Sequence, residues 1–211
     1  MPIKTALFLL TLCALLTGCA LSNKLDIFNQ PVLMPMAPPT GTARRVIQQI
    51  TALWPGRKET MLCVLELDNQ RIAMAGLTND GVGLFNLTYD GKTVVSDKSP
   101  LLADSVVPEF IITDLQLAYW PVNVLQKSLQ GSAWRLEADS NHRLLYYQGD
   151  KTIEVIYLLP DAVWVRSVEL INYRKNYRLQ INTISYEVLS DHQGVDGGSK
   201  HSSEFLSTPP Q

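Results

Sequence analysis

The chain has 211 residues, 46% of them hydrophobic, and a formal net charge of -2. This length favours one domain with flanking segments, and the hydrophobic content is sufficient for a core. Positive and negative charges are mixed along the sequence without a basic stripe, which argues against a nucleic-acid partner.

The amino terminus has the pattern of a bacterial lipoprotein signal. Lys4 precedes an apolar run, Ala6 to Leu16, that is too short to span a membrane. The run ends in Leu16-Thr17-Gly18-Cys19, which resembles the lipobox, whose cysteine is acylated and becomes the mature amino terminus. We expect residues 1–18 to be removed and acyl chains such as palmitate on Cys19 to anchor the protein. The alternatives are an ordinary signal peptide with an incidental cysteine and a short uncleaved anchor.

The residues around the folded domain indicate location and reach. Position 20 is alanine rather than aspartate, which by the sorting rule for such lipoproteins implies an outer-membrane anchor with the domain facing the periplasm. Residues 19–43 contain several prolines and predict an extended tether. We expect one folded domain over residues 44–189. The glycine- and serine-rich residues 190–211 predict a disordered tail.

Cysteine usage leaves one thiol in the predicted domain. Cys13 would leave with the signal peptide and Cys19 would be acylated, so no internal disulfide is expected. Cys63 lies in an apolar strand context, with no histidine near it in sequence. A buried hydrophobic role is therefore favoured over a nucleophilic one.

The first half of the domain predicts one short helix and then an antiparallel meander. Apolar residues from Val46 to Trp54 have helical spacing, and Pro55-Gly56 follows them. Short turns then separate four alternating runs. These predicted strands are Thr60 to Leu67, Arg71 to Leu77, Val82 to Tyr89 and Lys92 to Ser96. The faces expected to line an interior are Met61, Cys63, Leu65 and Leu67 on the first strand, and Gly83, Phe85, Leu87 and Tyr89 on the third.

A helical insert over residues 106–130 follows. Pro108 suits a helix start, and an apolar stripe continues at intervals of three or four residues. Its members are Ile111, Leu115, Ala118, Val122, Leu125 and Leu129. Pro121 should break the helix at Tyr119-Trp120-Pro121, which we interpret as a lid hinge, and Gly131 should end the second part.

A second set of strands follows the insert. They are predicted at Ala133 to Ala138, Arg143 to Gln148, Thr152 to Leu159, Val163 to Ile171 and Tyr177 to Leu189. The pattern predicts a mainly β fold with α, an α+β architecture. A strongly curved antiparallel sheet would form a half-open barrel whose concave face is covered by the insert.

Two family resemblances follow from this order of elements. The lipobox, tether, helix, meander, insert and second meander resemble the outer-membrane receptor of the lipoprotein-localisation system and its soluble periplasmic carrier, over about Arg44 to Leu189. Leu77-Thr78-Asn79 matches locally, but the following loop, Asp80-Gly81-Val82, lacks the receptor's exposed leucine. Thr113 to Pro121, together with Leu87 to Gly91, resembles an uncharacterised family of bacterial lipoproteins from aryl polyene gene clusters.

These resemblances imply a site for a hydrophobic chain between sheet and insert. Each candidate lining residue can instead be ordinary core, because a buried leucine and a cavity leucine look alike in sequence. The candidates are Met61, Cys63, Leu65, Phe85, Leu87, Ile111, Leu115, Trp120, Leu125 and Tyr157. The four tryptophans are open to three interpretations: core, ligand contact or protein interface.

Catalysis is not expected. His142 lies beside a turn and the other histidines are in the tail, and no metal, phosphate-binding or nucleophile motif is present. No cofactor or metal is predicted. Asp114 and Glu154 are the carboxylates of interest. Asp114 could orient a ligand headgroup, although a solvent-facing position on the helix is favoured.

Two functions are compatible with the sequence. The first is an outer-membrane-anchored periplasmic lipoprotein that binds or passes on an acyl lipid, a polyene or a lipoprotein acyl chain, with a periplasmic carrier protein as its partner. The alternative is a non-catalytic scaffold or accessory protein of an outer-membrane or polyene-export assembly.

Overall fold

The computed structural model describes residues 32–102, 106–158, 164 and 167–189. The predicted signal peptide, Cys19 and the tail 190–211 lie outside the described residues. The chain separates into two units, Met1–Met34 and Pro35–Gln211, and the fold below is that of the second. Among the described residues, no helix has the length and apolar character needed to cross a membrane.

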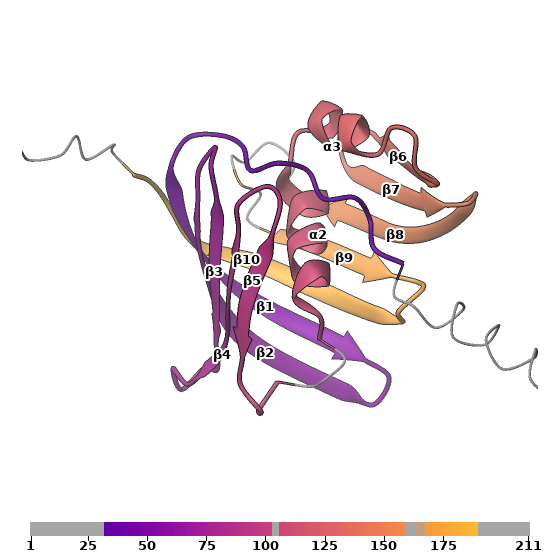
Figure 1. The fold of residues 1–211 in the computed structure, drawn as a ribbon. Helices are drawn as coiled ribbons and strands as arrows, with labels where there is room; N and C mark the ends of the chain where they lie inside the picture. Colours follow the sequence, from indigo (N-terminus) through magenta and orange to yellow (C-terminus); the bar gives the residue numbers. More distant parts are fainter. Residues whose placement is uncertain (1–31, 103–105, 159–163, 165–166, 190–211) are drawn as a thin grey trace, which may run out of the picture. The chain divides into compact units, whose positions relative to one another are not determined.

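The second unit is built on one ten-stranded antiparallel sheet with the strand order β5-β4-β3-β2-β1-β10-β9-β8-β7-β6. The sheet bends strongly, and helix α2 lies inside the bend (Figure 1). The predicted α+β fold with a curved, open sheet is confirmed. The strands are β1 (Arg44–Trp54), β2 (Arg57–Leu67), β3 (Ile72–Leu77), β4 (Gly83–Tyr89), β5 (Val94–Lys98), β6 (Trp134–Ala138), β7 (His142–Tyr147), β8 (Asp150–Tyr157), β9 (Ser167–Asn172) and β10 (Tyr177–Val188).

The predicted helix over Val46 to Trp54 is wrong, because these residues form β1 at the centre of the sheet. β1 pairs with β2 from Arg44↔Leu67 to Trp54↔Arg57 and with β10 on its other side. The spacing of the apolar residues suggested a helix because a polar residue, Gln48, occupies an inward position of the strand between Val46 and Ile50. Gln48 is buried, and its Nε2 donates to the Tyr119 hydroxyl at 2.7 Å and to Thr183 Oγ1 at 3.3 Å. A satisfied buried amide therefore hides the strand alternation.

All nine predicted strands have a counterpart in the sheet, although Leu159 and residues 163, 165 and 166 of two of them lie outside the described residues. Several hairpins use the same turn. At Asp68, Asp90 and Asp139, an Oδ1 accepts the backbone N–H groups two and three residues later. This side chain-to-backbone bonding explains why aspartate marks these turns. It also lowers the pKa of Asp90 and Asp139.

The insert forms α2 (Pro108–Tyr119) and α3 (Val122–Ser128), with the predicted break between them. Trp120 is extended, with φ -72° and ψ 150°, as the residue before a proline prefers to be. Residues 112–118 of α2 are all buried, so the helix is enclosed on every side and is not a simple amphipathic lid.

Residues 35–43, which we assigned to the tether, pack against α2 and belong to the compact unit. Gln116 Oε1 accepts the Ala37 N–H at 2.8 Å, and Gln116 Nε2 donates to the Ala37 carbonyl at 2.6 Å. Trp120 Nε1 donates to the Pro38 carbonyl at 2.8 Å. The segment crosses α2 in Figure 1, and we call it the strap.

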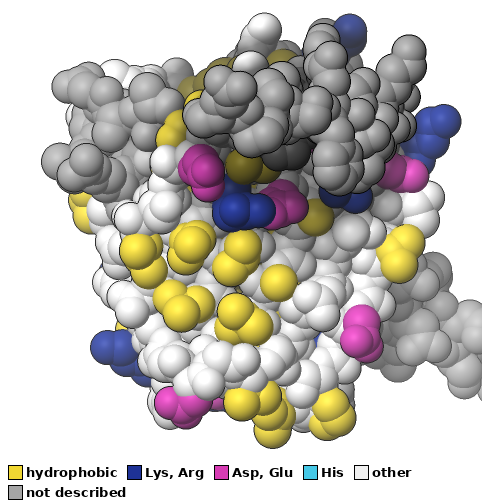
Figure 2. Space-filling view, turned by 90° about the vertical axis from the view of Figure 1, so that its left-hand side faces the viewer, with side chains coloured by type: hydrophobic (Ala, Val, Ile, Leu, Met, Phe, Trp, Pro, Cys, Tyr) yellow, Lys and Arg dark blue, Asp and Glu magenta, His cyan; other side chains and the backbone are white. Residues whose placement is uncertain are grey.

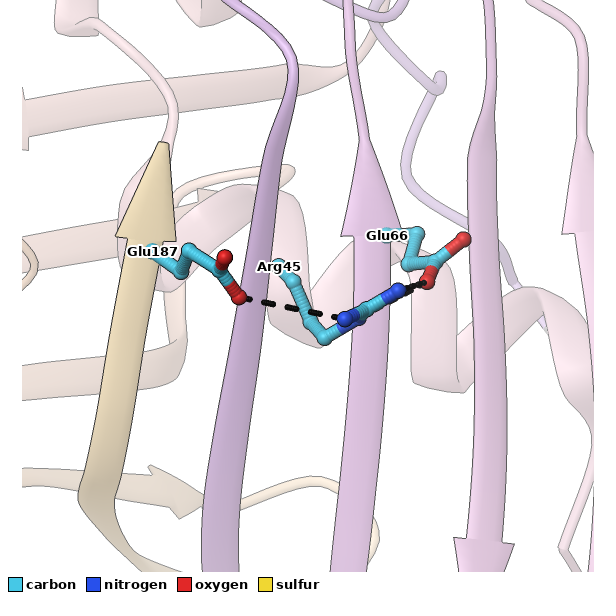
Figure 3. Close-up of polar contacts among 3 residues, drawn as sticks. All are labelled: Arg45, Glu66 and Glu187. Atoms are coloured by element: carbon cyan, nitrogen blue, oxygen red, sulfur yellow. Dashed lines mark hydrogen bonds and ion pairs between the residues drawn. The ribbon is translucent and has the colours of Figure 1, made fainter. Parts of the chain in front are cut away.

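The convex face of the sheet carries an ion-pair bridge over three strands. Arg45 on β1 contacts Glu66 on β2 at 2.6 Å and Glu187 on β10 at 3.8 Å (Figure 3). The pairs are exposed, so they contribute little to stability.

Figure 2 shows hydrophobic side chains gathered on this side. Ile47 and Val64, which pair in register and are half-buried, share the face of Arg45 and Glu66.

Gln116→Ala is expected to destabilise the fold and release the strap. The substitution leaves the Ala37 N–H and carbonyl unpaired in a buried place, where each lost partner costs about 1–3 kcal/mol. Urea unfolding should show the loss, and limited proteolysis should show new cleavage within residues 35–43. The control is Gln126→Ala on α3, an exposed glutamine with one 3.3 Å bond to the Leu136 carbonyl. Equal effects of the two variants would contradict this role of the strap.

Candidate functional site

A cavity of about 290 Å³ lies between α2 and the concave face of the sheet. This volume is at the lower end of the range for small-molecule sites, about 300–1,000 Å³. The sheet side of its wall consists of Gln48, Ile50, Ala52 and Trp54 from β1, Met61 and Cys63 from β2, Met74, Phe85, and Tyr177, Leu179 and Ile181 from β10. On the other side are Leu102, Val106, Val107, Phe110, Ile111, Asp114, Leu115 and Tyr119, and Lys175 completes the wall.

The cavity runs from an interior of buried apolar side chains to a rim that reaches solvent. Cys63 in its wall is fully buried, whereas Trp54 and Phe110 are half-buried and Lys175 is exposed. The Lys175 ammonium lies 4.7 Å from the centre of the Phe110 ring, a cation–π arrangement at the rim. One positive charge therefore stands at the entrance of a largely apolar space.

The wall contains half of the lining residues predicted from the sequence. Met61, Cys63, Phe85, Ile111 and Leu115 face the cavity. The other five predicted residues, Leu65, Leu87, Trp120, Leu125 and Tyr157, lie away from its wall. Four of these are buried in the core, and Tyr157 instead donates its hydroxyl to the Ala118 carbonyl at 2.7 Å.

Seven of the fifteen missed lining residues come from β1 and β10, and six come from residues 102–119, before and in α2. Predicting a helix over β1 concealed the inward alternation of Ile50, Ala52 and Trp54. On β10 the signal was present, because Tyr177, Leu179 and Ile181 alternate with the polar residues at 178 and 180.

The ring of Phe85 forms part of the cavity wall and packs against Gly76. Gly76 on β3 is buried, and a Cβ at that position would overlap the ring of Phe85 on β4. Glycine is required here because the aromatic ring lies directly over the backbone.

Asp114 is buried in the cavity wall, so the predicted solvent-facing position is wrong. It is 7% exposed, and its Oδ2 accepts a hydrogen bond of 2.5 Å from the Tyr177 hydroxyl, which in turn accepts one from Asn172 Nδ2 at 3.1 Å. Among the described residues, Oδ1 has no hydrogen-bond partner. Burial raises the pKa of Asp114 to about 7, and the bond from Tyr177 opposes the shift.

The predicted hinge, Tyr119-Trp120-Pro121, is firmly held in this structure. Tyr119 accepts the bond from Gln48, and its ring stacks on Trp164 with centroids 4.4 Å apart. The carbonyls of Leu117 and Ala118 accept bonds from Arg143 Nη1 and the Tyr157 hydroxyl, both at 2.7 Å. The carboxyl end of α2 is thus fixed to β1, β7 and β8. Its amino-terminal end has no side-chain cap and borders the rim.

The tryptophans have separate environments. Trp54 lines the cavity, and Trp120 is buried and bonded to the strap. Trp134 lies against Tyr147 with centroids 4.8 Å apart, and Trp164 stacks on Tyr119 and lies 4.7 Å from the Arg44 guanidinium carbon.

The groups considered for catalysis are dispersed. Burial raises the pKa of the Cys63 thiol to about 12, which disfavours a nucleophilic thiolate. His142 is half-buried and lies 3.5 Å from Asp139 in a hairpin turn, and Glu154 pairs with Lys151 at 3.1 Å. Within the described residues, no three His, Cys, Asp or Glu side chains are grouped to hold a metal ion.

Residues 45–185 match the model of a family described as protein of unknown function, DUF3261. The chain belongs to this family. The match covers the sheet from β1 into β10, and therefore includes the cavity and both helices. In sequence, no curated protein matches this DUF3261 member.

Solved structures with a partly similar fold include a LolA superfamily protein from Nitrosomonas europaea, at 8% identity and a TM-score of 0.42, covering 71% of this chain and 87% of the other. A putative outer membrane lipoprotein-sorting protein domain from Vibrio parahaemolyticus has 9% identity and a TM-score of 0.42, covering 71% and 86%. The Pseudomonas aeruginosa MucA/MucB complex has 17% identity and a TM-score of 0.36, covering 67% and 52%. These overlaps are partial, and the function proposed below rests on the cavity instead.

Asp114→Asn is expected to remove a pH dependence of stability. Between about pH 4 and pH 7 the unfolded chain gives up the Asp114 proton while the folded chain keeps it, so the free energy of unfolding of the wild type falls as pH rises. The full loss is on the order of 4 kcal/mol, because each pKa unit corresponds to about 1.4 kcal/mol. Urea unfolding of both proteins from pH 4 to pH 8 should show the variant gaining on the wild type up to about pH 7 and not beyond. A difference that stays constant with pH would contradict the burial of a titrating carboxyl.

Proposed function

We propose that this DUF3261 protein binds one hydrophobic chain in the cavity between α2 and the concave sheet. The observation that carries the proposal is the cavity itself, an apolar space of about 290 Å³ with a lysine at its rim. Such a space is suited to an elongated apolar ligand whose polar end remains at the entrance. An acyl lipid, a polyene or the acyl chain of a lipoprotein has this character, and the sequence resemblance to lipoproteins of aryl polyene clusters makes the polyene one candidate.

We also propose that acyl chains on Cys19 anchor the protein in the outer membrane, with the cavity on the periplasmic side. The support is the lipobox-like sequence directly after the apolar run, together with alanine at position 20. Several acyl chains hold a protein stably, whereas one holds it only marginally. In this setting the protein takes a chain from a periplasmic carrier, or passes one on, without catalysing a reaction.

Photo-crosslinking in the native membrane tests the ligand directly. With p-benzoylphenylalanine in place of Phe110 at the rim, irradiation should attach the bound chain, and mass spectrometry of the adduct should give its mass. The same amino acid in place of Val95, which is 63% exposed on β5 and does not line the cavity, should give no discrete adduct.

A cavity-filling variant completes this test. Ala52→Phe places a ring in the cavity and should abolish the adduct at position 110, while overpacking costs about 1–3 kcal/mol of stability. Absence of any adduct in the otherwise unaltered protein, or an adduct that survives Ala52→Phe, would instead favour the scaffold function.

Acylation is tested by metabolic labelling with a clickable palmitate analogue. The protein should take up the label, and Cys19→Ala should lose it, because the thiol is the expected attachment point. Cys63→Ala is the matched control and should keep the label, since that thiol is buried in the sheet. On a density gradient the labelled protein should fractionate with the outer membrane. Label retained by Cys19→Ala would contradict the proposed anchor.

A further inference from the structure

The Asp114 carboxyl differs from the other groups in the cavity wall. It is 7% exposed, it lies among mainly apolar neighbours, and Tyr177 satisfies only one of its oxygens. A buried polar atom without a partner costs about 1–3 kcal/mol. The fold retains this cost at a position that faces a cavity, where an apolar side chain could have filled the same place.

We propose that Asp114 is a specificity residue that hydrogen-bonds a hydroxyl group carried by the bound chain near its polar end. This inference rests on the proposed function, because it names the class of chain that the cavity takes. The ligand is then a hydroxylated acyl chain rather than a plain hydrocarbon chain.

The position of Asp114 along α2 places the hydroxyl. Phe110 and Lys175 mark the rim, and Asp114 lies four residues further along the helix than Phe110, a rise of about 6 Å. A chain whose anionic end contacts Lys175 therefore passes Asp114 within its first few carbon atoms. The remaining carbons reach Met74 and Cys63 in the apolar interior.

A hydroxyl suits this carboxyl better than a carbonyl or an amine does. An ionised carboxyl only accepts hydrogen bonds, whereas a protonated one can also donate, and a hydroxyl meets either form because it both donates and accepts. The Asp114 Oδ1 is closed to solvent in this structure. Asp114 lines the cavity and the torsion about its Cβ–Cγ bond is soft, so under this proposal the carboxyl turns when the hydroxyl binds.

Other polar side chains in the cavity wall already have hydrogen-bond partners. Tyr119 and Gln48 bond each other, and Tyr177 is held between Asp114 and Asn172. Lys175 supplies attraction for an anionic end, which a plain acyl chain and a hydroxylated one share. Among the described residues of the wall, Asp114 is the one with a buried side-chain oxygen that lacks a hydrogen-bond partner, and we assign the distinction between the two chains to it.

A competition experiment on the full-length protein in membranes tests the inference. The protein carries p-benzoylphenylalanine at position 110 and is irradiated with equal amounts of dodecanoic acid and 3-hydroxydodecanoic acid. Mass spectrometry gives the ratio of the two adducts. The same ratio in Asp114→Val corrects for unequal partition of the two acids into the membrane.

We expect the hydroxylated adduct to be enriched about tenfold over the Asp114→Val baseline, which corresponds to one hydrogen bond of about 1.4 kcal/mol. Tyr177→Phe leaves the carboxyl in place and should keep the enrichment. Lys175→Gln should lower both adducts and leave their ratio unchanged. If Asp114→Val does not fold, Asp114→Ala replaces it, because a methyl group can neither donate a hydrogen bond to a hydroxyl nor accept one from it.

The outcomes separate the two proposals. Equal enrichment in the wild type and the Asp114 variants overturns the hydroxyl specificity while leaving a chain-binding cavity intact. The absence of both adducts in the wild type overturns the proposed function, and the specificity with it.

Discussion

Burial of α2 on all sides is the constraint on which this structure depends. The polar groups of a helix inside a bent sheet lose contact with water, so each of them needs a hydrogen-bond partner from the protein. Gln116 finds one in the strap, and the carbonyls of Leu117 and Ala118 find theirs in Arg143 and Tyr157. These partners come from segments before and after the helix in the sequence, and they hold the helix above the concave face without filling the space beneath it.

Asp114 and Gln116, two buried polar residues of α2, have different roles. Asp114 and Gln116 are two residues apart, and so point in nearly opposite directions around the helix. Gln116 bonds the strap through both its oxygen and its nitrogen. Asp114 is half satisfied, and it lies on the side where the cavity is. A single turn of α2 thus contacts the strap on one side and the cavity on the other.

Much of the fold could be predicted from the sequence, because strand alternation, aspartate turns and Pro121 are local signals. β1 could not, since its inward face includes Gln48 and no longer reads as alternating apolar residues. The site was only half predictable. Met61, Cys63 and Phe85 follow from strand parity, but the Asp114–Tyr177 pair joins residues 63 positions apart, and nothing local in either segment indicates the contact. The packing of α2 inside the bent sheet decides which side of the helix faces the cavity, so the inward direction of Asp114 could not be predicted from the sequence.

Under the proposed anchoring, the strap would also limit how far the domain can lie from the membrane. Because the compact unit begins at Pro35, only the residues between Cys19 and Pro35 are available as a leash under the proposed anchoring. At about 3.4 Å per residue, that leash spans at most roughly 55 Å when fully extended. Under the proposed function, any donor or acceptor of the chain would then have to meet the mouth of the cavity within that distance of the membrane.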